Sequence, residues 1–179
     1  MTQVGNVYGE ALYTLAREEG LSQAVLQELT VLEQCFRDEP DFLRLLNSPN
    51  LSKSERCQIL EESFRDQLQL YVLNFLMLLT EKGYIRHFGE CCAVYRTRYN
   101  EDNGIVPVTA VTAVPLSQSQ YAALTEKLSA VTGKTVQLQN RVDPGVLGGV
   151  RLDYSGIRLD DTVAHRLDDI RARLAKTVL

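Results

Sequence analysis

Few residues of this 179-residue chain have the types and spacing that chemistry requires. Gly133-Lys134-Thr135 resembles the end of a phosphate-binding loop, but such a loop needs a further glycine where Leu128 stands. It also needs a strand before it and a helix after it, whereas here a helical pattern comes first and a β-branched pattern follows. We therefore interpret the tripeptide as a helix-to-strand turn and predict that the chain binds no cofactor.

The side chains that could ligate a metal or transfer a proton are scattered. The two histidines, His87 and His165, fall in different halves of the chain and have no cysteine pair or acidic residue at ligand spacing. Adjacent carboxylates cannot face each other across a cleft, so we interpret Asp160-Asp161 as a helix cap and Asp168-Asp169 as a solvated face. We predict no catalytic and no metal-binding residue, and we expect His165 to be an exposed helix residue.

The cysteines show no metal-binding or redox spacing, because no C-x-x-C is present. In the absence of a secretory signal they are expected to be reduced. Two adjacent cysteines point about 100° apart on a helix and make a poor metal clamp. We expect all four to be buried thiols that pack like small hydrophobes: Cys35, Cys57, Cys91 and Cys92.

Composition and charge indicate an ordinary globular protein, long enough for one large or two small domains. The richest apolar run, residues 71–79, is far shorter than the roughly 20 residues of a membrane span. No signal peptide is visible, so we expect a cytosolic protein or a peripheral one on the cytosolic side. Residues 1–102 hold 10 basic and 16 acidic residues, a net charge of −6, and residues 103–179 hold 9 and 7, a net charge of +2. This pattern excludes the basic stripe of a nucleic-acid-binding protein and fits either two modules with different partners or a solvated surface.

The first hundred residues have helical periodicity, with most glycines and prolines at helix ends. Ser52 and Glu55 form a capping box that predicts the start of a fourth helix, and Gly83 predicts the end of a fifth. Short connections between six helices predict an antiparallel bundle. The predicted helices cover about 3–19, 22–37, 41–46, the segment from 53, about 67–82, and a sixth that carries Phe88, Cys91, Val94, Tyr95 and Tyr99.

The remaining residues predict a small α/β module. After a polar break at 101–104, the β-branched run 105–114 predicts a strand, and residues 135–141 predict a second. Ser117 caps a predicted helix over 118–131, whose apolar face comprises Tyr121, Leu124, Leu128 and Val131. Residues 146–154 and 157–159 predict a hairpin, and the spacing of Val163, Leu167, Ile170 and Leu174 predicts a terminal helix. The expected fold is mainly α with a smaller α/β part, divided into domains 1–104 and 105–179.

The predicted fifth helix is apolar over more than one narrow stripe, which has two interpretations. It can be a central helix surrounded by the others. Alternatively, it shares with the first helix a groove that receives an amphipathic helix of another protein. Tyr8, Gly9 and Ala11 on the first helix are small or flat, and Gly9 costs about 1 kcal/mol relative to alanine in a helix interior.

Motifs along the whole chain resemble one family. D-P-x-x-x-G-G-V at 143–150, followed by L-D-D-T-V-x-x-R-L at 159–167, resembles the C-terminal signature of the delta subunit of bacterial F-type ATP synthases, whose mitochondrial relative is the oligomycin-sensitivity-conferring protein. Residues 7–13, 45–52 and 74–83 resemble the opening helix, the third-helix exit and the fifth helix of that family. The chain departs from the family pattern at Gly9, where alanine is usual, and at Asp161 and Thr162, where glycine and serine are common.

The resemblance implies a non-catalytic stator subunit on the cytoplasmic side of the bacterial plasma membrane, peripheral and part of a hetero-oligomeric complex. The bundle would bind the N-terminal helix of an alpha subunit through Tyr8, Ala11, Leu12 and Leu15 on one wall and Phe75, Leu78 and Leu79 on the other. The C-terminal module would hold the end of the b-subunit stalk through Gly148, Gly149, Val150, Val163 and Leu167. Without the resemblance, the residues are also compatible with an unrelated cytosolic adaptor that binds a partner's amphipathic helix, or with a small enzyme whose site the patterns do not reveal.

Overall fold

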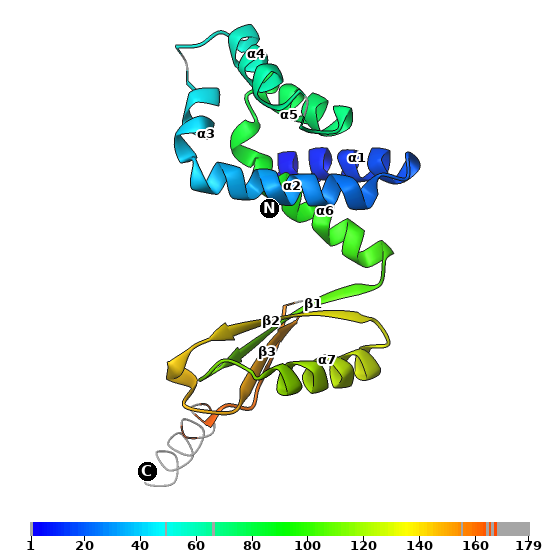
Figure 1. Cartoon of the computed structure of the whole chain (residues 1–179), viewed down its shortest axis with the longest axis vertical. Coiled ribbons are helices and arrows are strands. Elements are labelled where there is room, and N and C mark those ends of the chain that lie inside the picture. Colours follow the sequence, from blue (N-terminus) through cyan, green and yellow to red (C-terminus); the bar gives the residue numbers. More distant parts are fainter. Residues whose placement is uncertain are drawn as a thin grey trace, which may run out of the picture. The chain divides into compact units, whose positions relative to one another are not determined.

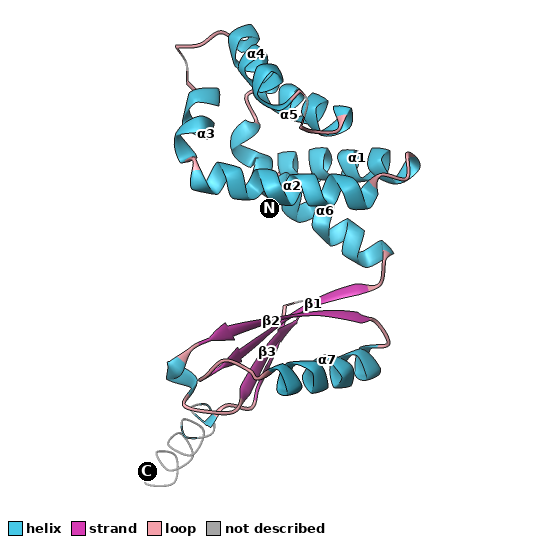
Figure 2. Ribbon diagram, in the orientation of Figure 1, coloured by secondary structure: helices cyan, strands magenta, loops and turns pink. Residues whose placement is uncertain are grey.

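The computed structural model describes residues 2–48, 50–65, 67–154, 156–163, 165 and 167. It is mostly helical, with one small four-stranded sheet (Figures 1 and 2). The chain divides into two compact units, of which the first ends at Tyr99 and the second begins at Asn100. This division falls inside a helix that ends at Asp102, whereas the sequence places the boundary between residues 104 and 105. No helix within the described ranges has both the length and the apolarity to cross a membrane.

The first unit is built from helices joined by short connections. The predicted limits of the first three helices agree with the structure to within one residue, and the Ser52–Glu55 capping box is present at the start of α4. Gly83 ends α5 in a left-handed conformation. The elements are α1 (Gln3–Glu18), α2 (Ser22–Asp38), α3 (Pro40–Leu46), α4 (Lys53–Phe64), α5 (Leu70–Lys82), the 3-10 turn η1 (Ile85–His87) and α6 (Phe88–Asp102).

Helix α5 begins three residues later than its periodicity predicts, at Leu70 instead of Gln67. The backbone N–H of Gln69 donates to the Glu28 carboxylate of α2 at 2.9 Å. The start of α5 is therefore fixed by a side chain 41 residues away, which local sequence patterns do not show. Burial of Glu28 raises the pKa of its carboxyl group, and the hydrogen bond from Gln69 opposes that shift.

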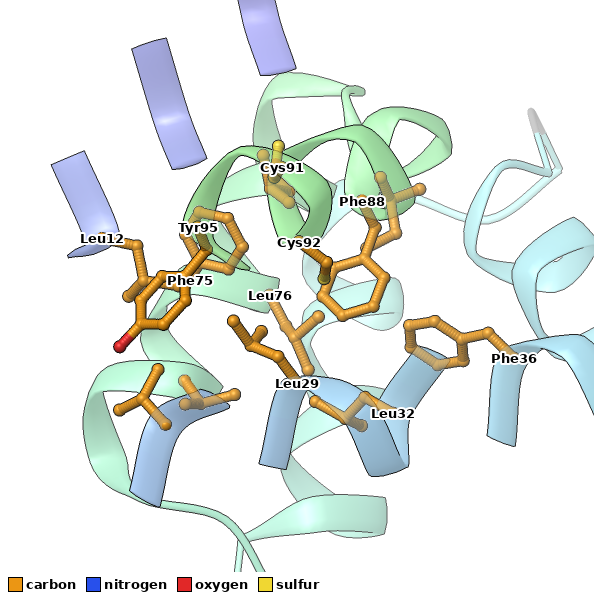
Figure 3. Close-up of a cluster of buried hydrophobic side chains, with 14 of the residues drawn as sticks. Leu12, Leu29, Leu32, Phe36, Phe75, Leu76, Phe88, Cys91, Cys92 and Tyr95 are labelled. Atoms are coloured by element: carbon orange, nitrogen blue, oxygen red, sulfur yellow. The ribbon is translucent and has the colours of Figure 1, made fainter. Parts of the chain in front are cut away.

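Helices α1, α2, α5 and α6 supply most of the core of the first unit, and their labelled side chains converge in Figure 3. Leu46 of α3 and Leu60 of α4 are fully buried in the same core. Tyr95 is fully buried, its hydroxyl donates to the Ser22 carbonyl at 2.9 Å, and its ring meets that of Tyr13 edge to face at 5.3 Å. Burial raises the pKa of the Tyr95 phenol. Phe36 and Phe88 make a second edge-to-face pair, at 5.1 Å. Such aromatic pairs add to the free energy of burial because their geometry is specific.

Helices α1 and α6 approach each other closely at Gly9. A Cβ atom at this position would lie 2.5 Å from the Cys91 carbonyl oxygen and 2.9 Å from the Cβ of Val94. At the start of α1, the backbone N–H and the hydroxyl of Thr2 donate to the Glu90 carboxylate at 2.5 and 2.7 Å. These bonds, with a further one to His87, lower the pKa of Glu90 to about 2.

The second unit places one helix on one face of a sheet (Figure 2). The strand order is β2-β1-β3-β4, with β1 parallel to β2 across the α7 connection and the other pairs antiparallel. Five buried residues form the cluster between the sheet and α7, Val111 and Val146 are buried apart from that cluster, and no residue of α7 is fully buried. The elements are β1 (Ile105–Thr112), α7 (Gln118–Thr132), β2 (Thr135–Val142), the 3-10 turn η2 (Pro144–Val146), β3 (Val150–Tyr154) and β4 (Ile157–Asp160).

Asn140 of β2 connects three segments of the second unit. Its side-chain oxygen accepts from the backbone N–H of Leu116, and its amide donates to the Ala110 carbonyl and to the Thr112 hydroxyl, all at 2.9 Å. The residue thereby ties β2 to β1 and to the segment that leads into α7. Partly buried amide networks of this kind specify one arrangement when every member has a partner.

Two predictions for the second unit are wrong. The strand expected over 146–154 begins only at Val150, because Asp143 accepts from the backbone N–H of Gly145 and starts a 3-10 turn, and Leu147 then has a φ of +60°. Val131 is 85% exposed, whereas Leu124 and Leu128 pack on the sheet, since a single helix covers a small sheet with a narrow stripe. Residues 163, 165 and 167 are helical, whereas Ile170 and Leu174 of the predicted stripe lie outside the described residues.

Candidate functional site

The residues that resembled chemical motifs have structural roles. Gly133 is the left-handed C-cap of α7 and leads into β2, so the predicted helix-to-strand turn is confirmed. Thr162 accepts from the backbone N–H of His165 at 3.2 Å, and Asp160 in turn accepts from the backbone and hydroxyl of Thr162. His165 is exposed, as predicted. Asp168-Asp169 lies outside the described residues, among which no cluster of three or more potential metal ligands occurs.

The four cysteines differ in burial. Cys91 and Cys92 are buried, and desolvation raises the pKa of both thiols, that of Cys91 to about 11. Cys57 is half-buried and its thiol pKa is also raised by desolvation. Cys35 is exposed, so the prediction that all four are buried is wrong. Residue 35 is next to the buried Phe36 on α2, and neighbouring side chains point about 100° apart on a helix, so that of Cys35 lies on the exposed face.

A groove of about 360 Å³ lies between α1 and α5, and we call it the α1/α5 groove. Each helix contributes four residues at i, i+3, i+4 and i+7, which is the spacing of one helical face over two turns. The lining residues are Tyr8, Ala11, Leu12, Leu15, Tyr71, Asn74, Phe75 and Leu78.

The structure brings to this groove six of the seven residues predicted to bind the alpha subunit. Leu79 is the exception, because it is fully buried in the core and does not line the groove. Tyr71 and Asn74 line the groove and were not predicted. Tyr71 lies four residues before predicted Phe75, and Asn74 lies four residues before predicted Leu78, so extending the i, i+3, i+4 pattern toward the start of α5 would have found them.

The α1/α5 groove is apolar and carries no charged side chain. Leu15 and Leu78 are about two-fifths exposed, at 39% and 40%. The Tyr8 ring is held edge to face by Tyr84 at 5.8 Å, so this wall is preformed. The groove has no nucleophile or acid–base pair, and its shape and chemistry suit the apolar face of an amphipathic helix.

Three of the five residues predicted for the stalk contact have roles inside the second unit. A Cβ atom on Gly149, whose φ is +78°, would lie 2.4 Å from the Asp161 carbonyl oxygen. The Gly148 carbonyl accepts from the backbone N–H of Val163 at 3.0 Å, and Val150 packs against the sheet core. These residues hold residues 161–163 against the turn that precedes β3.

The other two predicted stalk residues expose apolar side chains, Val163 at 43% and Leu167 at 44%. Strand β4 exposes two more, Ile157 at 56% and Leu159 at 61%. Leu159 is paired directly with Leu152, which packs against the core, so both side chains lie on the face that α7 covers. Strand β4 therefore extends the apolar face of the sheet beyond the area that packs against α7.

Each unit leaves apolar surface uncovered, which is typical of proteins that bind other proteins. A family model for the ATP synthase delta (OSCP) subunit matches residues 4–174. The chain therefore belongs to the ATP synthase delta (OSCP) subunit family.

Relatives and a solved structure agree with this assignment over nearly the full length. The chain is 34% identical over 176 residues to ATP synthase subunit delta of Alkaliphilus oremlandii (strain OhILAs), covering 98% of each chain. It is 31% identical to ATP synthase subunit delta of Clostridioides difficile (strain 630), covering 98% of this chain and 97% of the relative. A chain of the Toxoplasma gondii mitochondrial ATP synthase hexamer superposes with a TM-score of 0.78 at 18% identity, covering 97% and 98%, and shows the same fold.

The chain is thus a non-catalytic stator subunit of a hetero-oligomeric ATP synthase. The alternative of an unrelated helical adaptor is not favoured. The structure also gives a reason for one departure from the family pattern, because Gly9 stands where a larger residue would meet the backbone of α6.

Proposed function

We propose that this protein links the catalytic alpha/beta ring to the b-subunit stalk through two separate surfaces. In the first unit, α1–α6 act as one antiparallel bundle that binds the N-terminal helix of an alpha subunit in the α1/α5 groove. The second unit holds the C-terminal end of the b subunit. We infer that the protein acts on the cytoplasmic side of the bacterial plasma membrane, as a peripheral subunit of this complex.

The α1/α5 groove is the observation that supports the first contact. Its two walls offer apolar residues at the same helical spacing, so a third helix can lie between them with its own i, i+3, i+4 residues facing inward. The absence of charge along the groove favours a partner face made of aliphatic and aromatic side chains. Only Asn74 offers a side-chain amide, which can fix the axial position of the bound helix.

The exposed apolar side chains of the second unit support the stalk contact. Val163 and Leu167 remain candidates, whereas Gly148 and Gly149 act by shaping the turn below the terminal helix. We add Ile157 and Leu159 of β4, because the edge strand exposes them on the apolar face of the sheet. A stalk helix lying on this face would cover side chains that the unit itself leaves in water.

Two surfaces on one chain suit the mechanical task. Rotation of the central shaft applies torque to the catalytic ring, which must be held by the membrane-anchored stalk so that ion flow drives ATP synthesis. A single groove of this size gives modest affinity, whereas two contacts on one chain make the second binding event intramolecular and slow dissociation of the whole assembly.

Titration of the full chain with a synthetic peptide of the same organism's alpha-subunit N-terminus tests the first contact. We expect a one-to-one complex of micromolar or tighter affinity by calorimetry. Ala11→Asp places a charge in the groove and should weaken binding at least about 30-fold, since burying an unpaired charge costs about 2 kcal/mol or more.

The matched control is Thr14→Asp, which adds the same side chain to an exposed position of α1 outside the groove. Its affinity for the peptide should equal that of the unmodified chain. Equal losses in both variants would mean that charge on α1, and not the groove, controls binding. No complex by calorimetry and by a second method would overturn the proposed contact.

A further inference from the structure

A second and larger concave site lies at the corner where α2 turns into α3, facing the end of α4. Its volume is about 700 Å³, roughly twice that of the α1/α5 groove, and it falls in the range of small-molecule pockets. We call it the acidic basin. Neither the family assignment nor the proposed stator contacts use it.

The floor of the acidic basin is aromatic. Phe42 of α3 stacks on Phe36 of α2 at 5.9 Å with 23° between the rings, and it meets Phe64 of α4 edge to face at 5.8 Å. Phe36 also meets the buried Phe88 edge to face, so the floor is anchored in the core of the unit (Figure 3). Leu45, 41% exposed, adds an aliphatic side wall.

The rim of the acidic basin carries three carboxylates, Asp38, Glu39 and Asp41. Asp38 accepts a hydrogen bond from the neutral Gln34 amide at 2.8 Å. Asp41 pairs with Arg44 at 2.7 Å, but both side chains are about four-fifths exposed, at 82% and 80%. Such an exposed pair contributes little stability, so Arg44 is not held firmly on Asp41. The rim is therefore available to a positive group on a ligand.

We propose that the acidic basin binds small organic cations with an apolar body, the class that includes hydrophobic amines. The apolar body would lie on the Phe36–Phe42–Phe64 floor, and the positive centre would face the carboxylate rim. Aromatic faces add to this preference, because their negative electrostatic potential attracts cations and repels anions.

The arrangement of the lining residues favours a compact ligand over a helix. The α1/α5 groove repeats one face over two turns on each wall, whereas the acidic basin is built mostly from residues 35–45 around one tight corner, with Phe64 closing it. A helix needs a trough several turns long, which this corner does not provide. A rounded apolar cation fits both the shape and the charge.

The test compares two ions of the same shape and opposite charge, tetraphenylphosphonium and tetraphenylborate, each titrated into the full chain at low salt. We expect saturable one-to-one binding of tetraphenylphosphonium, at least about tenfold tighter than that of tetraphenylborate. The rim carboxylates outnumber Arg44, the partner of Asp41, and the ring faces act in the same direction. Raising the salt concentration should reduce the difference.

The triple variant Asp38→Asn, Glu39→Gln and Asp41→Asn keeps the shape of the rim and removes its charge. In this variant, the affinity for tetraphenylphosphonium should exceed that for tetraphenylborate by about twofold or less. The control neutralises three exposed carboxylates elsewhere, Glu18→Gln, Glu19→Gln and Glu126→Gln, and should keep the preference. Leu45→Gln, at a partly exposed position, should weaken binding of both ions.

Cys35 reports the location of the bound ion, because its exposed thiol lines the acidic basin. Saturating tetraphenylphosphonium should slow the alkylation of Cys35 by iodoacetamide, measured by mass spectrometry of the peptide that contains it. Excess alpha-subunit peptide should leave this protection unchanged, so the result is independent of the proposed alpha contact. Equal affinity for the two ions, a preference that survives the triple variant, or binding without protection of Cys35 would each overturn the proposal.

Discussion

The two units of this protein bury their apolar side chains to different degrees. The first has a core to which all of α1–α6 contribute, with Tyr95, Leu29, Leu32 and Leu76 at 1% exposure or less. Among the described residues of the second unit, the cluster beneath α7 has five buried side chains, Val111 and Val146 are buried apart from it, and α7 buries none of its own side chains fully. Small cores give small stabilities, so the difference teaches that the second unit depends more on what binds it.

Among the substitutions considered, Gly9→Ala is expected to lower the stability of the protein most. It adds a side chain at the close contact between α1 and α6 in the first unit. The new Cβ would lie 2.5 Å from the Cys91 carbonyl oxygen, and backbone cannot yield as a flexible side chain can. We expect the free energy of unfolding to fall by about 1–3 kcal/mol, although alanine is intrinsically the better helix former. Urea unfolding followed by circular dichroism measures the change.

Gly89→Ala is the matched control on α6, where a Cβ meets nothing within 4 Å. It should leave stability unchanged or raise it by up to about 1 kcal/mol. If Gly9→Ala behaved like the control, α1 and α6 would be free to separate, and the first unit would not have the rigid core that the comparison assigns to it.

Sequence patterns predicted the first unit better than the second, for a physical reason. Helical periodicity and caps such as Ser52 are local, so α1–α4 could be predicted closely. The start of α5 depends on Glu28 and the turn at Leu147 on a strained backbone, and neither is visible in a hydrophobic pattern.

The two concave sites of the first unit show the same limit. For the α1/α5 groove, the broad apolar surface of α5 left two interpretations open, and the lining residues were expected from the family resemblance. Neither separated buried Leu79 from the lining residues Tyr71 and Asn74. The acidic basin could not be predicted, since it joins Phe36, Phe42 and Phe64 from three helices. Which side chains meet across a corner depends on crossing angles that the sequence does not state.

Asn140→Ala is expected to have the second largest effect, confined to the second unit. The substitution removes three hydrogen bonds and leaves the Leu116 N–H without its acceptor, which costs about 1–3 kcal/mol. Hydrogen exchange should speed up in β1 and β2 and stay unchanged in α1–α6. Gln139→Ala, at the exposed neighbouring position, is the control and should leave exchange unchanged in both units. If Asn140→Ala also sped up exchange in α1–α6, the two units would unfold together and the effect would not be confined to the second unit.

Glu90→Gln should give a smaller and pH-dependent effect on the first unit. The pKa of Glu90 is lowered from 4.5 to about 2 by its bonds to Thr2 and His87. A carboxyl whose pKa is lower in the folded state contributes stability above its unfolded pKa and loses that contribution as the pH falls toward the folded value.

The melting temperature of the unmodified chain should therefore exceed that of Glu90→Gln at pH 7, and the difference should shrink between pH 4.5 and about 2. Glu62→Gln, at an exposed position of α4, serves as the control for the loss of one charge. A difference that stays constant over this pH range would show that the carboxylate does not hold the start of α1 on α6.

Leu159→Lys is expected to change stability least, and this small effect is informative. Leu159 is 61% exposed on the edge strand β4, so replacing it should alter the free energy of unfolding by no more than about 0.5 kcal/mol. The substitution should instead weaken binding of a peptide from the C-terminal end of the b subunit. We expect a loss of affinity of at least about tenfold, because an unpaired ammonium group would be buried.

Lys134→Leu, a change of opposite sign at an exposed turn, controls for net charge. If Leu159→Lys unfolded the second unit while leaving stalk affinity intact, the exposed apolar face would belong to the unit's own packing, and the contrast between a closed first unit and an open second one would fail.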